Sequence, residues 1–105
     1  MITYDIYGIQ AGSMEEICMR IEELLSIDMV AHESSFMGDY YLGKSLDEEF
    51  EVRNNRDLVD GERVRDDLPD TAILLYISRT KRAEELEKKL TGTISGLRLL
   101  RRTEK

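Results

Sequence analysis

Residues 32–35 join a histidine, an acid and two serines, a grouping whose residue types could perform acid–base or nucleophilic chemistry. The segment predicts a β-strand, in which successive side chains point to opposite faces. His32 and Ser34 then share one face while Glu33 points to the other, so the histidine and the acid cannot pair without a bulge. A serine nucleophile also needs an oriented base and an oxyanion hole, and the sequence holds no nucleophile-elbow pattern.

We therefore predict that His32 is a structural residue, hydrogen-bonded to a neighbouring strand or loop, and that the protein is not an enzyme. The sequence also lacks a P-loop, a dinucleotide-binding glycine motif after a strand and a zinc-protease motif. A small enzyme that uses His32 with nearby acids remains the alternative.

Carboxylates crowd a second short segment and could in principle bind a metal ion. Asp47, Glu48, Glu49 and Glu51 lie within a five-residue stretch. They lack the alternating ligand spacing and the fixed glycine of a calcium loop. With a single cysteine, the chain also has no Cys/His cluster for zinc. We therefore expect exposed strand acids here, with no metal and no cofactor.

Charge is distributed unevenly along the chain, whose net charge is −7. Residues 1–43 carry eight acids and one base, residues 44–70 ten acids and five bases, and residues 79–105 nine bases and four acids. The acidic part repels nucleic acid and anionic membranes and attracts basic partners, although acids also serve solubility alone. The basic part could bind phosphate, but no aromatic residues interleave with its arginines. We expect neither nucleic acid nor a membrane as the partner.

The elements that must position these residues begin with a strand over residues 1–10, which is apolar on both faces as an interior strand requires. Ser13 then starts a helix with Glu16 at the capping-box spacing, and an apolar stripe continues to Leu25. Cys18 lies inside that stripe. It is predicted to be a small core residue rather than a nucleophile.

A meander of three short strands is predicted next, over residues 29–35, 39–42 and 48–53. Gly38 and Gly43 lie at its two corners, because glycine adopts positive φ without steric cost. Tyr40 and Tyr41 point to opposite sides of the middle strand, so one ring is expected in the core and the other at the surface. Residues 54–70 have the composition of a long surface or functional loop.

The rest of the chain predicts a strand, a helix and a final strand. Residues 72–78 form a continuous apolar run typical of a buried strand. Thr80 caps a helix over residues 81–90 with Gly92 at the C′ position, and residues 97–102 form the last strand. The resulting order, β-α-β-β-β-β-α-β, predicts a single domain of all 105 residues. Its fold class is α+β, an antiparallel sheet with two helices on one face, ferredoxin-like or related.

The compartment is predicted from what the sequence lacks. No apolar run approaches the roughly 18 residues needed to span a bilayer. Residues 1–12 lack the basic and apolar regions of a signal peptide, and a single cysteine excludes an internal disulfide. We expect a cytoplasmic protein.

Three segments together resemble a known family: the strand ending Tyr7-Gly-Ile-Gln10 before a capped helix, the stretch HESSFMGDYY from His32 to Tyr41, and LPDTAILLYI over residues 68–77. They resemble the small acidic immunity proteins encoded beside polymorphic and contact-dependent growth inhibition toxins in bacteria. The resemblance implies a cytoplasmic protein without chemistry of its own. Such a protein binds the C-terminal domain of its cognate toxin, often a nuclease, and blocks it. The family is diverse, so the resemblance transfers no binding residue by motif.

The charge pattern fits that expectation, because a nuclease must hold a polyanion in a basic cleft and clustered carboxylates are steered into such a cleft. We expect a monomer or a weak homodimer. The alternative is a regulatory or scaffold domain that oligomerises through its sheet. The residues predicted to bind the toxin are Asp39, Tyr40, Asp47, Glu48, Glu49 and Glu51, with Asp57, Asp60 and Glu62 of the long loop as a second set.

Overall fold

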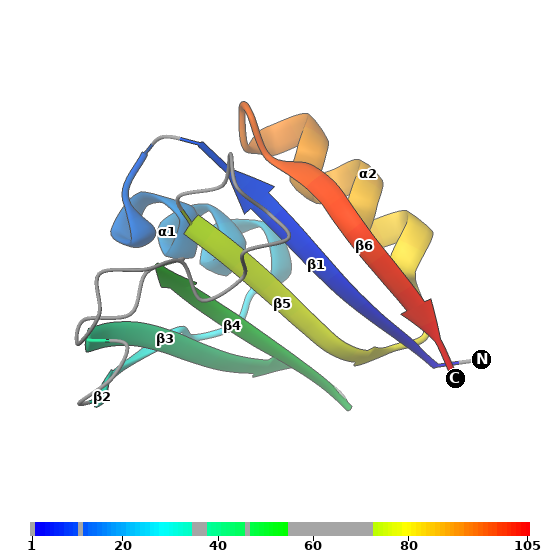
Figure 1. Cartoon of the computed structure of the whole chain (residues 1–105), viewed down its shortest axis with the longest axis horizontal. Helices are drawn as coiled ribbons and strands as arrows, with labels where there is room; N and C mark the ends of the chain where they lie inside the picture. The colour runs from blue at the N-terminus through cyan, green and yellow to red at the C-terminus, as the bar shows by residue number, and fades with distance from the viewer. Residues whose placement is uncertain (1, 11, 35–37, 46, 55–72) are drawn as a thin grey trace.

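The computed structural model describes residues 2–10, 12–34, 38–45, 47–54 and 73–105 of the chain (Figure 1). The predicted α+β class and the order β-α-β-β-β-β-α-β are both confirmed. The elements are β1 (Thr3–Ile9), α1 (Met14–Leu25), β2 (Val30–Ser34), β3 (Gly38–Ser45), β4 (Glu48–Asn54), β5 (Ile73–Thr80), α2 (Ala83–Thr93) and β6 (Arg98–Glu104).

All six strands form one sheet in the order β2-β3-β4-β5-β1-β6, and every neighbouring pair is antiparallel. β1 lies between β5 and β6, which confirms the prediction of an interior strand. Its Asp5 is paired with Ile77 of β5 on one side and with Arg102 of β6 on the other. The first and last strands are therefore neighbours at one side of the sheet, where β6 is the edge strand. The narrower ferredoxin-like assignment stays a prediction.

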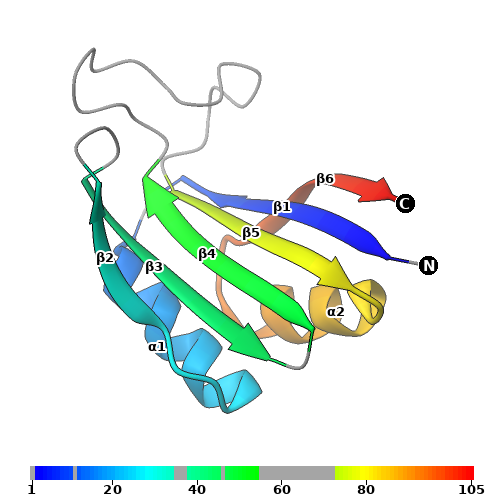
Figure 2. The same ribbon diagram turned by 90° about the horizontal axis from the view of Figure 1, so that it is seen from below.

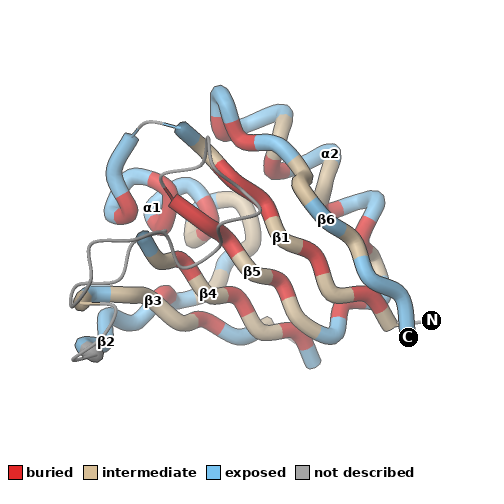
Figure 3. Tube along the Cα trace, in the orientation of Figure 1, coloured by how far each residue is buried: buried red, intermediate tan, exposed pale blue. Residues whose placement is uncertain are grey.

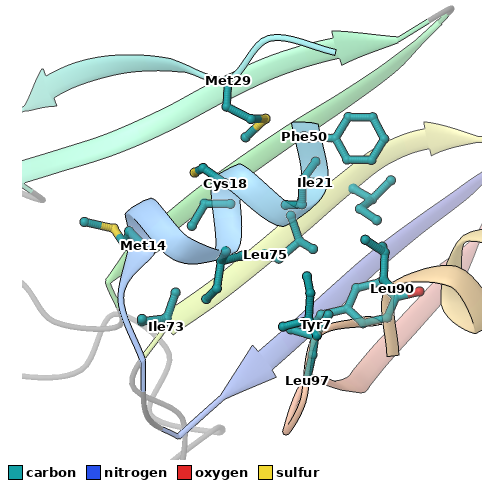
Figure 4. Close-up of a cluster of buried hydrophobic side chains, with 14 of the residues drawn as sticks. Tyr7, Met14, Cys18, Ile21, Met29, Phe50, Ile73, Leu75, Leu90 and Leu97 are labelled. Atoms are coloured by element: carbon teal, nitrogen blue, oxygen red, sulfur yellow. The ribbon is translucent and has the colours of Figure 1, made fainter. Parts of the chain in front are cut away.

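Both helices cover the same face of the sheet, as predicted (Figure 2). Burial alternates along β1 and β4 because successive side chains point to opposite faces (Figure 3). Cys18 of α1 is 4% exposed and lies in the core, which confirms its predicted role. Burial, followed by the nearby Glu22 and Glu15, raises the pKa of its thiol to about 12. The core between helices and sheet contains Tyr7, Ile17, Ile21, Phe50, Val52, Leu75, Ile77, Leu86 and Leu90 (Figure 4).

Both ends of α1 are fixed by hydrogen bonds that the sequence encodes locally. The Ser13 hydroxyl accepts from the backbone N–H of Glu16 at 3.1 Å, which confirms the predicted cap. At the other end Ser26 takes the left-handed conformation, with φ of 55°, and its N–H donates to the Glu22 carbonyl. The Glu22 carboxylate in turn accepts from the N–H of Met29 at 2.9 Å. The helix end therefore determines where β2 begins.

Gly43 was predicted to form a corner, and that prediction is wrong. It lies inside β3, whose eight residues run from Gly38 to Ser45. A Cβ at this position would lie 2.5 Å from Met29 Sδ and 2.9 Å from the Asp28 carbonyl oxygen. Glycine is needed because the connection between α1 and β2 packs directly on this strand. Gly38, by contrast, has φ of 73° at the start of β3, as its predicted corner requires.

The second helix is displaced from its predicted start and end. It begins at Ala83 rather than at residue 81, and Gly92 lies inside its last turn instead of following it. Thr80 does not cap the helix, although its hydroxyl accepts from the N–H of Arg82 at 3.1 Å. The same hydroxyl donates to Glu48. This tertiary bond fixes the chain before α2 begins.

Candidate protein-binding surface

The acids predicted to form one surface on β4 point to both faces of the sheet. Glu48 shares the helix-covered face with Phe50 and Val52, because alternate residues of a strand point the same way. Glu49 and Glu51 point to the opposite face, which we call the open face. One short run of carboxylates is therefore divided between two environments.

Glu48 is 4% exposed, so the prediction that it is an exposed strand acid is wrong. Its Oε1 accepts from Arg82 Nη2 at 2.7 Å and its Oε2 from Arg82 Nε at 3.0 Å, while Thr80 donates a further bond. Burial raises the pKa of Glu48, but the hydrogen bonds from Arg82 and Thr80 outweigh it and hold the pKa below its ordinary value. Glu48 therefore joins β4 to the chain before α2, and it is not available to a partner.

Glu49 and Glu51 are half-buried on the open face and each has an arginine of this chain beside it. Arg53 Nη1 lies 3.2 Å from Glu51 Oε2, and Arg79 Nη2 lies 3.8 Å from Glu49 Oε2. Arg79 also donates through Nε to the backbone oxygen of Asp47 at 3.2 Å. The negative charge of this segment is thus largely compensated by the protein itself.

Arg79 reaches these groups from an irregular backbone. Its φ is 59°, a left-handed conformation that residues other than glycine rarely adopt. The pairing of β1 with β5 shifts register beside it, between Thr3 and Asp5, as at a β-bulge. The irregularity coincides with an arginine side chain that contacts β4 and the corner before it.

Asp39 and Tyr40 lie on β3 close to its pairing with β2. The Tyr40 ring stacks on the ring of His32, with centroids 5.4 Å apart and an angle of 21° between the planes. His32 is exposed, and its contact with the neighbouring strand is this ring stack rather than the predicted hydrogen bond. Tyr41 points the other way, packs against the core and donates to Glu15 Oε1 at 3.3 Å. The predicted division of the two tyrosines is confirmed.

Exposed acids without a cationic partner gather on α1, β2, β3 and the connection between them. In Figure 1 these elements lie on the left, opposite α2, β6 and the chain ends. Within the part of the chain that the structure describes, the ion pairs all involve other acids. Arg20 and Lys44 are the bases of these elements. We call this set of acids the acidic end; its members are Glu15, Glu16, Glu23, Asp28, Glu33 and Asp39.

The helical acids of this set were not predicted, although the sequence contains a signal for them. Residues 1–43 have the largest imbalance of acids over bases in the chain. The density of carboxylates at 47–51 attracted the prediction instead. Density in sequence was misleading because three of those four acids interact with arginines that are distant in sequence or on the same strand.

A second buried carboxylate lies near the other end of the molecule, on β1. Asp5 is 1% exposed and accepts from Arg102 Nε at 3.0 Å and Nη2 at 2.9 Å. Arg102 also contacts Glu87 and the backbone oxygen of Ala83, so it links β6 to α2. The hydrogen bond with Asp5 is the largest cause that raises the pKa of Arg102. The arrangement is a structural ion-pair cluster that the sequence analysis missed.

Asp57, Asp60 and Glu62 lie outside the described residues. The described residues contain no group of three or more His, Cys, Asp or Glu side chains placed to hold a metal ion. Neither of the helices found in the described ranges is long and apolar enough to cross a bilayer.

Comparison with known proteins gives no relative from which a role could be transferred. The chain matches no protein-family model and no curated protein. The resemblance to immunity proteins therefore rests on the three sequence segments that carry it, and the binding surface has to be inferred from geometry and charge.

Proposed function

We propose that this chain is an immunity protein that binds a cognate bacterial toxin domain and neutralises it by covering a basic cleft. The observation that carries the proposal is the acidic end, whose exposed carboxylates have no cationic partner in the described part of the chain. A nuclease is the toxin class that fits best, because it binds a polyanion through lysines and arginines. The protein acts by binding alone, without metal or cofactor, in the cytoplasm, as a monomer or weak homodimer.

Unpaired carboxylates suit this role for two physical reasons. Because no base of this chain neutralises them, their negative electrostatic field attracts a basic partner and speeds its association. They also accept charge-assisted hydrogen bonds on contact without first giving up a cation of their own chain. Glu49 and Glu51 would have to exchange Arg79 and Arg53 for the partner's bases, so their net contribution is smaller.

Apolar and aromatic anchors lie among these acids. Met19 is 55% exposed on α1. Glu15 and Glu23 stand four residues before and after it, and therefore share its face of the helix. Methionine adapts to irregular partner surfaces, and Tyr40 offers the kind of ring that dominates many interfaces. The toxin-binding set that we propose keeps Asp39 and Tyr40 from the sequence prediction and replaces Glu48 with the acids of α1 and β2.

The proposal is tested with the C-terminal domain of the protein encoded by the reading frame directly upstream. This domain is expressed in bacteria with and without the chain, and growth is followed. We expect growth arrest that the chain relieves, and a complex whose affinity falls at least about tenfold between about 0.05 M and 0.5 M salt, because screening weakens exposed charge pairs. Continued arrest with no complex by calorimetry, or turnover of a substrate by the chain itself, would contradict the proposal.

A scaffold domain that oligomerises through its sheet is the second candidate. One observation favours it: β2 lies at a sheet edge and its Val30 is 55% exposed. A stable dimer at micromolar concentration by light scattering would support this candidate over the first.

A further inference from the structure

β2 is the more exposed of the two edge strands of the sheet. It pairs with β3 on one side only. Each residue from Val30 to Glu33 is exposed. The other edge strand, β6, has half-buried Leu99, Leu100 and Arg102, the last of them bonded to Asp5 and α2. β2 therefore offers backbone N–H and C=O groups along an edge whose side chains from Val30 to Glu33 are open to solvent.

The features that usually prevent an edge from adding another strand are scarce on β2. Its register with β3 is regular from Val30↔Leu42 to Ser34↔Gly38, without a bulge. The strand contains neither proline nor lysine. On β6, in contrast, the pairing with β1 shifts register between Ile6 and Tyr7, and the sequence RLLRRTE carries three arginines. Glu33 is the one charged residue of β2.

Glu33 lies directly opposite Asp39 in the pairing of β2 with β3. Like charges in directly opposed positions repel each other and destabilise the pair of strands. Both side chains are exposed, and neither has an ion pair within the described part of the chain. On the other side of the same strands, the stacked rings of His32 and Tyr40 provide an apolar surface beside Val30. The edge therefore combines open backbone, uncompensated negative charge and an aromatic contact.

We propose that the outer edge of β2 receives an extended basic segment of the toxin domain as a seventh strand. The inference rests on the proposed function and specifies its contact. Main-chain hydrogen bonds to β2 supply the pairing. Lysine or arginine at alternate positions of the added strand neutralises Glu33 and Asp39, and the intervening apolar residues contact Val30 and the His32–Tyr40 stack.

A second copy of this chain suits the same edge less well. Two β2 strands paired with each other would bring together two copies of Glu33 and Asp39, with no cation to compensate them. Repulsion between two chains of net charge −7 adds to that cost. A basic partner avoids both penalties. The negative charge of this edge therefore favours a basic partner over a second copy of the chain.

Hydrogen–deuterium exchange followed by NMR on the complex with the upstream-encoded domain tests the inference. In the free chain, the amides of β2 that point away from β3 exchange rapidly. In the complex they are expected to slow by at least about tenfold, because each would become hydrogen-bonded. Outward amides of β6 serve as an internal control and should not change. If the domain binds while β2 exchanges as before, the inference is overturned and the proposed function stands.

A titration that does not need the toxin separates the two possible failures. The probe is a capped peptide that alternates lysine with valine, and the control alternates glutamate with valine. We expect chemical shift changes along β2 and β3 with the basic peptide and none with the acidic one. If the upstream domain does not bind, shifts with the basic peptide alone show that the edge accepts a basic strand, while the toxin as its occupant and the proposed function both fail. If neither the upstream domain nor the basic peptide binds, the inference and the proposed function are both overturned. A free chain that is already a dimer with protected β2 amides overturns both as well.

Proline substitutions test the backbone contribution separately from charge. In Ala31→Pro and His32→Pro the lost N–H groups point in opposite directions, one toward β3 and one outward. The variant that loses the outward N–H is expected to keep its thermal midpoint. It should bind the toxin domain at least about tenfold more weakly, because it loses a main-chain hydrogen bond to the added strand. Exchange in the wild-type chain identifies which of the two it is. Unchanged binding by that variant overturns the inference.

Discussion

Two regions of this molecule use carboxylates in opposite ways. On β1 and β4, Asp5 and Glu48 are buried, and each is held by an arginine through two nitrogens. At the acidic end, Glu33 and Asp39 face each other across two strands without a base. The first pair stabilises the fold, and the second pair slightly opposes it. Carboxylates that destabilise their own protein and remain exposed are the ones that we assign to a partner.

The two kinds of carboxylate should contribute very different amounts to the free energy of unfolding. Removing one member of a buried, hydrogen-bonded ion pair typically costs about 3–5 kcal/mol, because the other charge is left without a partner. An exposed charge typically contributes about 0–1 kcal/mol. The two regions should therefore respond very differently to the same kind of substitution.

Asp5→Ala should produce the largest loss of stability. Arg102 would lose both of its bonds to the buried carboxylate and would keep the more exposed Glu87. We expect the free energy of unfolding to fall by about 3–5 kcal/mol in urea denaturation. Asp39→Ala is the matched control, with a change below about 0.5 kcal/mol. Equal effects of the two substitutions would remove the distinction between the regions.

Glu48→Gln should have the next largest effect, a loss of about 1–3 kcal/mol at neutral pH, since the amide cannot compensate Arg82. The effect should depend on pH. The folded pKa of Glu48 lies below its ordinary value, so its contribution is complete above the unfolded pKa, about 4.3. It is lost as the pH falls through the folded pKa. Denaturation of both proteins between neutral pH and about pH 3 should show the difference shrinking toward zero at the acid end.

Gly43→Ala tests how the acidic end is attached to the sheet. The added methyl group would meet Met29 Sδ and the Asp28 carbonyl, and the backbone carbonyl cannot rotate away. We expect a loss of about 1–3 kcal/mol in thermal or urea denaturation. Gly92→Ala is the control, because nothing lies within 4 Å of its added Cβ and alanine is the better helix former. A Gly43→Ala variant as stable as wild type would mean that this contact is not tight.

Relieving the like-charge pair should have the smallest effect on stability. Glu33→Gln removes one of two opposed charges while keeping the side-chain shape. We expect a change of no more than about 0.5 kcal/mol, in the stabilising direction, that disappears at high salt. A destabilised variant would indicate that Glu33 has a favourable partner in the folded chain.

Local signals explain most of what the sequence predicted correctly. Ser13 and Glu16 placed the start of α1, and the period of the apolar residues identified its buried face, including Cys18. Alternation along β1 and β4 predicted their two faces. The features that were missed depend on contacts between distant residues. Gly43 resembles a turn residue in sequence, and only the packing of Met29 against it shows why it lies within a strand.

The same limit applied to the candidate surface. Glu48 is indistinguishable from Glu49 in sequence, since its partner Arg82 lies 34 residues away. The charge of residues 1–43 did indicate the acidic end, but the sequence could not show that its acids lack partners while those of β4 have them. Exposure and pairing, rather than the number of acids, distinguish the two regions.

The central claim is tested most directly by comparing two double charge reversals in binding to the upstream-encoded toxin domain. One carries Glu33→Lys with Asp39→Lys, and the other carries Glu49→Lys with Glu51→Lys. By calorimetry at low salt, we expect the first to raise the dissociation constant by about 100-fold and the second by less than about tenfold, because the β4 acids are already compensated. Full-strength binding by the first variant together with a large loss in the second would contradict the account.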